Sequence, residues 1–420
     1  MNPAAPRRVA VTGLGIVSCL GRSHDEVTRR LRRGESGIRA MPEWAEFGIS
    51  SLVAGTPGDV AEMRRTASIP KELLFSMSDA ALFCALSAQD AVADAGLSPA
   101  DLNSPRVACI VGNGSFGMAS AAYAHAQLAH AGQARRIPPF ALLQCMSSSA
   151  SATVANLLKV QGPSYSIAAA CATSAHNIGH AFMLVRLGVA DIAVAGGGEE
   201  VDALIAASFE GMRNVLSSSR NHAPAQASRP FDTQRDGLVL SGGGGIVVLE
   251  ALAHARARGA KPRAELIGYG ATSDAHAMVT PRPDGALAAA CMRQAMDDAG
   301  IAPDAIDYVN AHGTATPAGD RAEVEALRLV FGTRMPPFSS TKSMTGHALA
   351  AAGVHELIYC IGMLEQGFLA PSINIDQIDP AFEGLPVLQA ATDSAPRTIL
   401  TNNFGFGGTN ASMVLRSGEA

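Results

Sequence analysis

The sequence has little charge and few aromatic side chains: of its 420 residues, 16% are charged, 5% are aromatic and one is tryptophan. Hydrophobic residues make up 48%, and this much apolar content with so little charge excludes a disordered chain. No run of 18 uninterrupted apolar residues occurs, which excludes a membrane-spanning helix. The net charge of −5 argues against general nucleic-acid binding. We therefore expect a globular protein with large buried cores.

Cysteines are few and scattered. The seven cysteines are an odd number and include no C-x-x-C pair, so the sequence predicts neither a disulfide framework nor a zinc site. The first residues, Met1 to Arg8, lead directly into a predicted strand and lack the apolar core of a signal peptide. These features favour a cytoplasmic enzyme without a metal.

Two segments of the sequence recur in the same order in the two halves of the chain. Residues 9–18, VAVTGLGIVS, are similar to residues 264–273, AELIGYGATS. Residues 91–99, AVADAGLSP, are similar to residues 295–303, AMDDAGIAP, and both read as the end of a helix followed by a strand. Buried strands alternating with helices in two similar halves predict an α/β protein with mixed layers.

A third similarity sets Ala168–His176 against Ser339–His347, and it places Cys171 opposite Lys342. In both segments a short strand is expected to end in small residues before a helix begins. We therefore expect the His347 segment to begin a helix that corresponds to the one after Cys171.

The separation between matching segments shrinks along the chain, which predicts two insertions in the first half, at about 22–75 and 115–150. The basic segment 254–262 is the expected boundary. We accordingly divide the chain into an N-terminal half, 1–254, and a C-terminal half, 255–420.

Local signals support this layout. A capping box at Ser23–Glu26 predicts the start of a helix, and a second helix is expected from about 78 to 95. The glycine runs at 196–198 and 242–245 lack the spacing of a phosphate-binding loop. Close packing of the backbone is the better interpretation of both runs.

Cys171 is the first candidate catalytic residue. It lies in SIAAACATSAH, where a strand is expected to end and a helix to begin among small residues. The positive end of a helix dipole lowers a thiol pKa and favours the thiolate. The small neighbours leave room for a substrate carbonyl, so we interpret Cys171 as a nucleophile.

Two histidines occupy strand-to-helix turns, where sites form in layered α/β folds. His312 lies in NAHGTATP and His347 in STKSMTGH. Two neutral imidazoles can donate N–H groups to one developing oxyanion, and Lys342 would add positive potential beside them.

The segment 402–410, NNFGFGGTN, combines two phenylalanines with glycines. It is either a tight turn between strands or a functional loop. In the second case the Phe406 backbone N–H completes an oxyanion hole with that of Cys171, and Phe404 and Phe406 belong to a loop that gates the site.

Four of these motifs together resemble one family. The sequence resembles the β-ketoacyl-acyl-carrier-protein synthases, condensing enzymes of the thiolase superfamily, over essentially the whole chain. The motifs are AACATS at 169–174, HGTATP at 312–317, KSMTGH at 342–347 and FGFGGTN at 404–410. Segments elsewhere resemble the type I branch more than type II, namely AGGGEE at 195–200, GYGATSD at 268–274 and APSINI at 370–375.

This resemblance implies the five-layered αβαβα thiolase fold with duplicated halves, and a homodimer or a heterodimer with a ketosynthase-like partner. It implies that Cys171 accepts the acyl group while His312 and His347 act on malonyl-ACP. Lys342 matches the active-site lysine of the family and Glu323 its partner acid, although Glu323 is alternatively a structural charge near a helix start.

The resemblance also implies the substrate and its carrier. Thr314 and Thr316 match the threonines that bind the pantetheine arm, and the acyl groups arrive on the phosphopantetheine of an acyl carrier protein with no metal or redox cofactor. In the stretch GNGSFGM, Ser115 and Phe116 are expected to reshape the acyl pocket.

A basic patch on the two insertions is expected to dock the acidic carrier protein. Its candidate residues are Arg64, Arg65, Lys71, Arg135 and Arg136. Glu72 and Phe75 stand where housekeeping type I enzymes carry basic residues. This departure favours a dedicated pathway, such as polyene or specialised lipid synthesis, over bulk fatty-acid elongation.

Two other functions compete with a condensing acyltransferase. A chain-length factor, a partner subunit without condensing activity, lacks the nucleophilic cysteine that this chain has at Cys171. A coenzyme-A thiolase needs a second catalytic cysteine near the C-terminus, whereas Cys360 falls in an apolar helix.

Overall fold

The computed structural model describes residues 6–115 and 117–418. Within them, ten strands form one continuous sheet in the order β11-β10-β14-β15-β9-β1-β8-β6-β4-β5. The strands of the first half are β1 (Val9–Val17), β4 (Val107–Asn113), β5 (Ser164–Tyr165), β6 (Ile192–Glu199) and β8 (Gly243–Ala251). Those of the second half are β9 (Ala264–Ser273), β10 (Tyr308–Asn310), β11 (Phe338–Ser339), β14 (Thr398–Gly405) and β15 (Thr409–Ser417).

Both halves of this sheet have the same topology. In each half the strands lie in the order third, second, fourth, fifth and first along the chain. The second strand runs parallel to the third and the fourth, and the fifth runs antiparallel to the fourth and the first. The halves join where β1 pairs antiparallel with β9. The predicted duplication is therefore present in the strand order itself.

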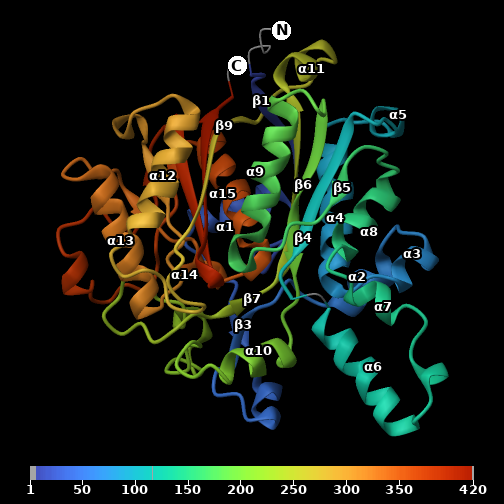
Figure 1. Ribbon diagram of the computed structural model, residues 1–420. Helices are drawn as coiled ribbons and strands as arrows, with labels where there is room; N and C mark the ends of the chain where they lie inside the picture. Colours follow the sequence, from blue (N-terminus) through green and yellow to red (C-terminus); the bar gives the residue numbers. More distant parts are fainter. Residues whose placement is uncertain (1–5, 116, 419–420) are drawn as a thin grey trace.

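Helices form three layers around the two halves of the sheet. In the centre, α9 (Thr173–Arg186) and α15 (Ala352–Gln366) pack on each other and on strands of both halves. The first half is covered outside by α4 (Asp79–Asp94) and α8 (Ser149–Leu158). The second is covered by α12 (Ala286–Ala299), with α13 (Pro317–Phe331) beside it (Figure 1). The result is the predicted αβαβα arrangement.

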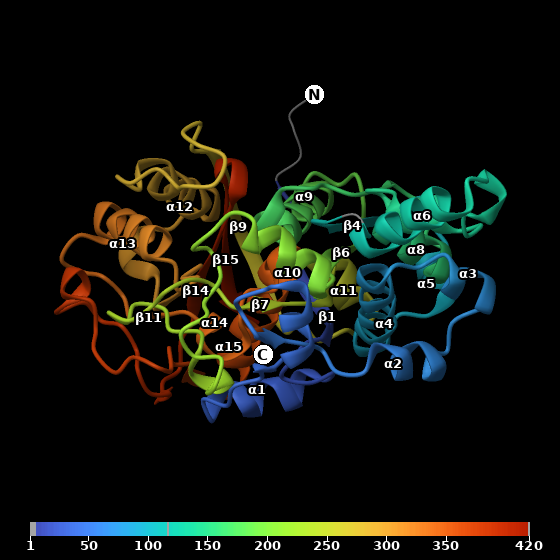
Figure 2. The same ribbon diagram turned by 90° about the horizontal axis from the view of Figure 1, so that it is seen from below.

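Shorter elements surround this frame. The two expected insertions of the first half carry α1 (His24–Arg32), β2 (Arg39–Ala40), β3 (Val53–Gly55), α2 (Val60–Thr66), α3 (Lys71–Phe75), α6 (Met118–Ala131) and α7 (Ala141–Cys145). The remaining elements are α5 (Pro99–Leu102), α10 (Ala203–Glu210), β7 (Leu240–Ser241), α11 (Leu252–Ala257), α14 (Lys342–Thr345), β12 (Phe368–Leu369) and β13 (Thr392–Asp393). Seen from below, α2, α3 and α6 lie at the end of the molecule opposite α12 and α13 (Figure 2).

The first two sequence repeats are reproduced in backbone detail. The pairing with the neighbouring strand is interrupted immediately before Gly13 in β1 and before Gly268 in β9. A Cβ on Gly13 would lie 2.1 Å from the carbonyl oxygen of Ala91 in α4, and one on Gly268 would lie 2.1 Å from that of Ala295 in α12. Glycine at both positions therefore lets the outer helix of each half lie directly against its strand.

The third repeat was predicted in the wrong register. Cys171 lies in a 3-10 turn, η3 (Ala170–Ala172), that leads into α9, and the matching turn before α15 is η6 (Leu349–Ala351). The first residues of these turns both have a positive φ, 46° and 48°. Cys171 therefore corresponds to Ala350 and not to Lys342, because the second half inserts α14 between its strand and its central helix.

Most local predictions are confirmed. Ser23 caps α1 by accepting the Glu26 backbone N–H at 3.3 Å, and α4 spans almost the whole of the predicted 78–95 helix. The glycine runs lie along β6 and β8, where a Cβ on Gly196 would lie 2.1 Å from the Gly245 carbonyl oxygen. They serve close packing, as predicted.

The predicted boundary between 254 and 255 falls inside α11, and the division into two halves at that point stays a prediction. In the described part of the chain, no helix is long and apolar enough to cross a membrane.

Candidate active site

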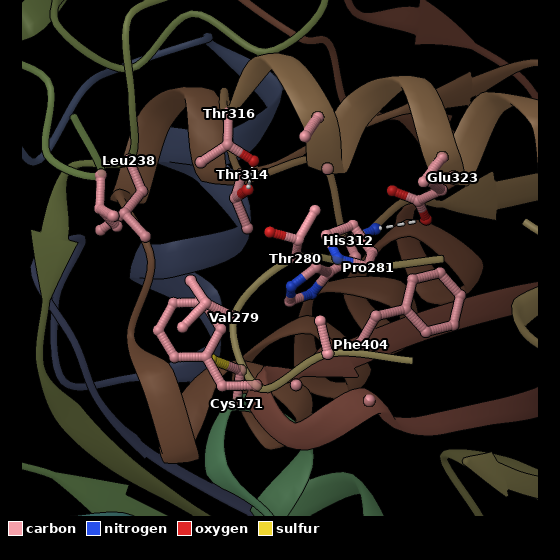
Figure 3. A pocket seen from close by; sticks show the side chains of 18 of the residues that line it. Cys171, Leu238, Val279, Thr280, Pro281, His312, Thr314, Thr316, Glu323 and Phe404 are labelled. Atoms are coloured by element: carbon pink, nitrogen blue, oxygen red, sulfur yellow. Dashed lines mark hydrogen bonds between the residues drawn. The ribbon is translucent and has the colours of Figure 1, made fainter. Parts of the chain in front are cut away.

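One cavity of about 440 Å³ brings together residues from both halves of the chain. Cys171, His312, His347 and Phe404 line it, although they lie on separate elements. Figure 3 shows the side chains of Cys171, His312 and Phe404 around this space. The residues predicted to carry chemistry are therefore neighbours in space.

Cys171 lies at the buried end of the cavity and is 7% exposed. Burial raises the pKa of its thiol to about 11, while a hydrogen bond from the Phe406 backbone N–H and the charge of Lys342 act in the opposite direction. This shift is opposite to the lowered pKa predicted from the helix start, because removal from water outweighs the nearby positive groups. The free protein therefore holds Cys171 as a thiol.

The two histidines lie against each other at right angles. Their ring centroids are 5.2 Å apart and the ring planes meet at 88°. Burial and the positive charge of Lys342 hold the pKa of both His312 and His347 well below the usual value. Both imidazoles are therefore neutral at pH 7, which is the state predicted for N–H donors.

The groups around the two rings determine which ring nitrogens can form hydrogen bonds to a substrate. Lys342 Nζ lies 3.4 Å from His312 Nδ1. Because an ammonium group only donates hydrogen bonds, Nδ1 must accept, and the proton of His312 is assigned to Nε2. Both ring nitrogens of His347 are buried and have no hydrogen-bond partner among the described residues. These atoms are available to a bound substrate.

Lys342 is held by an acid that the sequence did not reveal. Its ammonium group pairs with the carboxylate of Glu356, on α15, and both side chains are almost fully buried. Asn403 Nδ2 donates to the other oxygen of Glu356 at 2.7 Å. α15 carries two acids in an otherwise mostly apolar sequence, Glu356 and Glu365, and nothing in that sequence marks Glu356 as the partner of Lys342.

The assignment of Glu323 as the partner acid of Lys342 is wrong. Its two carboxylate oxygens accept the backbone N–H groups of His312 and Gly313, at 2.8 and 2.7 Å. Burial raises the pKa of Glu323 to about 7 against these hydrogen bonds. Glu323 reaches the backbone of the turn after β10, so it positions His312 through its main chain.

The two predicted phenylalanines lie on either side of the end of β14, Phe404 inside the strand and Phe406 in the turn after it, and they contact different groups. The Phe404 ring packs on His312, with centroids 5.9 Å apart. Phe406 packs on Phe209, with centroids 6.0 Å apart, and its backbone N–H is directed at the Cys171 sulfur. Of the two, Phe406 therefore has the contact expected of an oxyanion-hole residue.

The remaining predicted binding residues divide into three groups. Thr314 and Thr316 line the cavity, with their hydroxyl oxygens 3.0 Å apart. Ser115 is not among the residues that line it; its hydroxyl donates to the buried carboxylate of Glu199. Phe116 lies outside the described residues.

The predicted docking residues also differ from one another. Arg64 is only partly exposed, and it pairs with Asp79 at 2.6 Å and donates to the Met77 carbonyl at 3.0 Å. This arginine joins α2 to the start of α4 and is not free to bind a partner. Arg65 is exposed but pairs with Glu62 at 2.6 Å. The remaining three, Lys71, Arg135 and Arg136, are exposed.

Comparison with known proteins identifies the family. Family profiles described as the beta-ketoacyl synthase N-terminal and C-terminal domains match residues 6–255 and 263–376. The chain belongs to the β-ketoacyl synthase family. It is 45% identical to 3-oxoacyl-[acyl-carrier-protein] synthase 1 of Escherichia coli (strain K12), over 98% of this chain and 99% of that protein. The synthase 1 of Haemophilus influenzae is 43% identical over the same shares.

Solved structures of β-ketoacyl synthases have the same fold. A β-ketoacyl synthase from Burkholderia phymatum superposes with a TM-score of 0.92 at 32% identity, over 98% of this chain and 100% of that one. The ishigamide ketosynthase/chain length factor superposes with a TM-score of 0.90 at 32% identity, over 99% and 100%. The thiolase fold and a condensing acyltransferase, both implied by the sequence motifs, are confirmed.

Proposed function

We propose that this protein catalyses the decarboxylative Claisen condensation of malonyl-ACP with an acyl group held on Cys171. The observation that carries the proposal is the meeting of Cys171, two neutral histidines and the Phe406 backbone N–H in one cavity. A thiol nucleophile and uncharged hydrogen-bond donors are the groups that the two half-reactions require.

The first half-reaction transfers the acyl chain. The Cys171 sulfur attacks the carbonyl of an acyl-ACP thioester, and the tetrahedral oxyanion accepts hydrogen bonds from the N–H groups of Cys171 and Phe406. When the intermediate collapses, the carrier thiolate leaves and takes up the proton that Cys171 has lost. Because the buried thiol of Cys171 has a raised pKa, this proton leaves only when the thioester is in place.

The second half-reaction forms the carbon–carbon bond. Malonyl-ACP loses carbon dioxide, and the enolate oxygen accepts the N–H of His312 and an N–H of His347. The enolate carbon then attacks the Cys171 thioester, and the Cys171 sulfur leaves as a thiolate and takes up a proton from solvent, the one proton that each condensation consumes. Thr314 and Thr316 are proposed to hold the pantetheine arm, and the reaction draws on no metal or redox cofactor.

The structure favours this reaction over the two alternatives. A chain-length factor has no use for a cysteine at the end of a cavity lined by two histidines. For a thiolase, the second cysteine would have to reach the site, but Cys360 is fully buried inside α15 and does not line the described cavity. Cys171 is the one cysteine among the lining residues.

We propose that the active form is a homodimer joined along β5. This strand is the edge of the sheet, both of its residues are exposed, and an open edge invites pairing with another chain. An exposed apolar side chain, Met183, lies on α9, whose His180 contacts Tyr165 of β5, and two more, Leu142 and Leu143, lie on α7, which packs on α8 next to β5. A ketosynthase-like partner in place of the second copy is the alternative, and the mass of the purified protein in solution distinguishes the two.

The carrier protein is proposed to dock on the exposed cations Lys71, Arg135 and Arg136, in the cytoplasm. Glu72 is exposed beside Lys71 and opposes an acidic partner, which favours a carrier protein of a dedicated pathway over that of bulk fatty-acid synthesis. Turnover with each carrier protein, at low and high salt, tests this preference. Equal kinetics with both would assign the protein to ordinary elongation.

The direct test of the reaction is incubation of the purified protein with acyl-ACP and malonyl-ACP. The expected products are a β-ketoacyl-ACP and one carbon dioxide for each condensation. Formation of neither product by the folded protein would overturn the proposed function.

A further inference from the structure

The cavity that ends at Cys171 opens to solvent at its other end. Cys171, His312 and His347 are at most 8% exposed. By contrast, Met212, Met278 and Val279, which line the same cavity, are 45%, 77% and 45% exposed. The cavity therefore has a buried chemical end and an exposed rim.

Arg213 lies at this rim. It lines the cavity and is exposed, and within the described residues its side chain makes no hydrogen bond or ion pair. The other lining arginine, Arg282, is paired with Asp284 at 2.7 Å. Asp274 is already engaged by Asn410 Nδ2 at 2.8 Å and by the Arg282 backbone N–H at 3.0 Å. Arg213 is therefore the lining arginine that has no ion-pair partner among the described residues.

The backbone at Arg213 has an uncommon conformation. Arg213 and its neighbour Asn214 both have left-handed conformations, with φ of 57° and 55°, and they follow the end of α10 after two intervening residues. Two consecutive non-glycine residues in this region are strained, and such strain persists where the surrounding structure enforces it, most often at functional sites. Here the Arg213 N–H donates to the Glu210 carbonyl at 3.0 Å, which ties the turn to the end of the helix.

We propose that Arg213 binds the phosphate group of the phosphopantetheine arm while the thioester at the other end of the arm reaches Cys171. This inference rests on the proposed function, because that reaction brings a thioester to the buried end and leaves the phosphate at the exposed end. A guanidinium group donates two parallel hydrogen bonds to a phosphate. Arg213 is thus a binding residue for the arm and takes no part in bond making.

Malonyl thioesters of pantetheine and of 4′-phosphopantetheine, both free of carrier protein, test the assignment. The measured quantity is the ratio of kcat/KM for the phosphorylated thioester to that for the unphosphorylated one, followed by release of carbon dioxide. We expect Arg213→Ala to lower this ratio about three- to tenfold, since a charge-assisted hydrogen bond at an exposed site is lost. Arg213→Lys should restore part of it, and the effect should shrink in high salt.

The matched control is Arg334→Ala, which removes an exposed arginine that does not line the cavity and should leave the ratio at the wild-type value. An unchanged ratio in Arg213→Ala overturns the proposal, whether activity with both thioesters falls equally or only turnover with intact carrier protein falls. The second pattern would assign Arg213 to carboxylates of the carrier protein. Absence of carbon dioxide release by the wild-type protein from either thioester, and from malonyl-ACP, would instead count against the proposed function.

Discussion

Lys342 and Glu356 form an ion pair in the interior of the protein, where the two side chains are 2% and 3% exposed. The same ammonium group lies 3.4 Å from His312 Nδ1. The pair therefore has two consequences, since it satisfies a buried charge and fixes which nitrogen of His312 carries its proton. The first consequence can be tested by substitution of the two residues.

Removing one member of the pair should destabilise the protein more than removing both. Lys342→Met leaves Glu356 buried without a counterion, and we expect a loss of about 3–5 kcal/mol in the free energy of unfolding. The double variant Lys342→Met/Glu356→Gln should recover part of this loss. Urea denaturation of both single variants and the double variant measures the coupling, and purely additive losses would mean that the pair does not stabilise the fold.

Replacing Cys171 should separate the two half-reactions. Cys171→Ser should abolish condensation because a hydroxyl loses its proton far less readily than a thiol and is the weaker nucleophile toward a thioester. Cys171→Gln should keep malonyl-ACP decarboxylation, because its amide resembles the acylated side chain while both histidines remain. Carbon dioxide release and product formation are measured on the same preparations. A folded Gln variant that releases no carbon dioxide would contradict the roles proposed for His312 and His347.

Each histidine should be needed for decarboxylation and not for acyl transfer. His312→Ala and His347→Ala should each lower carbon dioxide release on the order of a hundredfold, since each removes a donor from the enolate oxygen, while Cys171 still accepts acyl groups. Because the pKa of both imidazoles lies well below the usual value, decarboxylation by Cys171→Gln should stay level from pH 8 to pH 6. A drop centred near pH 6.5 would show that an imidazole titrates normally.

Glu199 should make the protein less stable as the pH rises. Burial raises its pKa to about 7, above the usual 4.5, so the folded state holds a proton that the unfolded state has released. The contribution of this carboxyl to stability is therefore present below pH 4.5 and is lost as the pH rises through 7. Glu199→Gln should raise the free energy of unfolding at pH 8 by up to about 3 kcal/mol and leave it unchanged at pH 4.5.

The exposed Glu383→Gln is the control for this measurement, and it should change stability little at either pH. Denaturation at the two pH values distinguishes the outcomes. An equal gain at both pH values would show that Glu199→Gln acts through packing and not through ionisation.

The sequence predicted the fold and most of the candidate site because both depend on short segments whose residue patterns can be recognised locally. The close approach of α4 and α12 leaves no room for a side chain at Gly13 and Gly268. Glycine therefore occurs at the same place in both halves, and this is why the duplication can be recognised in the amino-acid sequence. Cys171 and His312 lie in the segments that follow β5 and β10, whereas His347 lies just after α14. The fold brings these three side chains together in one cavity.

Other features depend on distances across the fold and left no such pattern. Glu356 reaches Lys342 from a different helix, and nothing in its local sequence distinguishes it from Glu323. The pKa of Cys171 depends on how much protein surrounds it, and a helix start by itself predicted the wrong direction. The register of the third repeat was misread because α14, an extra element, contains residues similar to those around Cys171.

The measurement that tests the account most directly is mass spectrometry of the peptide that contains Cys171, after incubation with isotopically labelled acyl-ACP. We predict that this peptide gains the mass of the acyl group and loses it on addition of malonyl-ACP, with release of carbon dioxide and formation of the β-ketoacyl product. A label that is absent from Cys171, or that stays there after malonyl-ACP is added, would contradict the account.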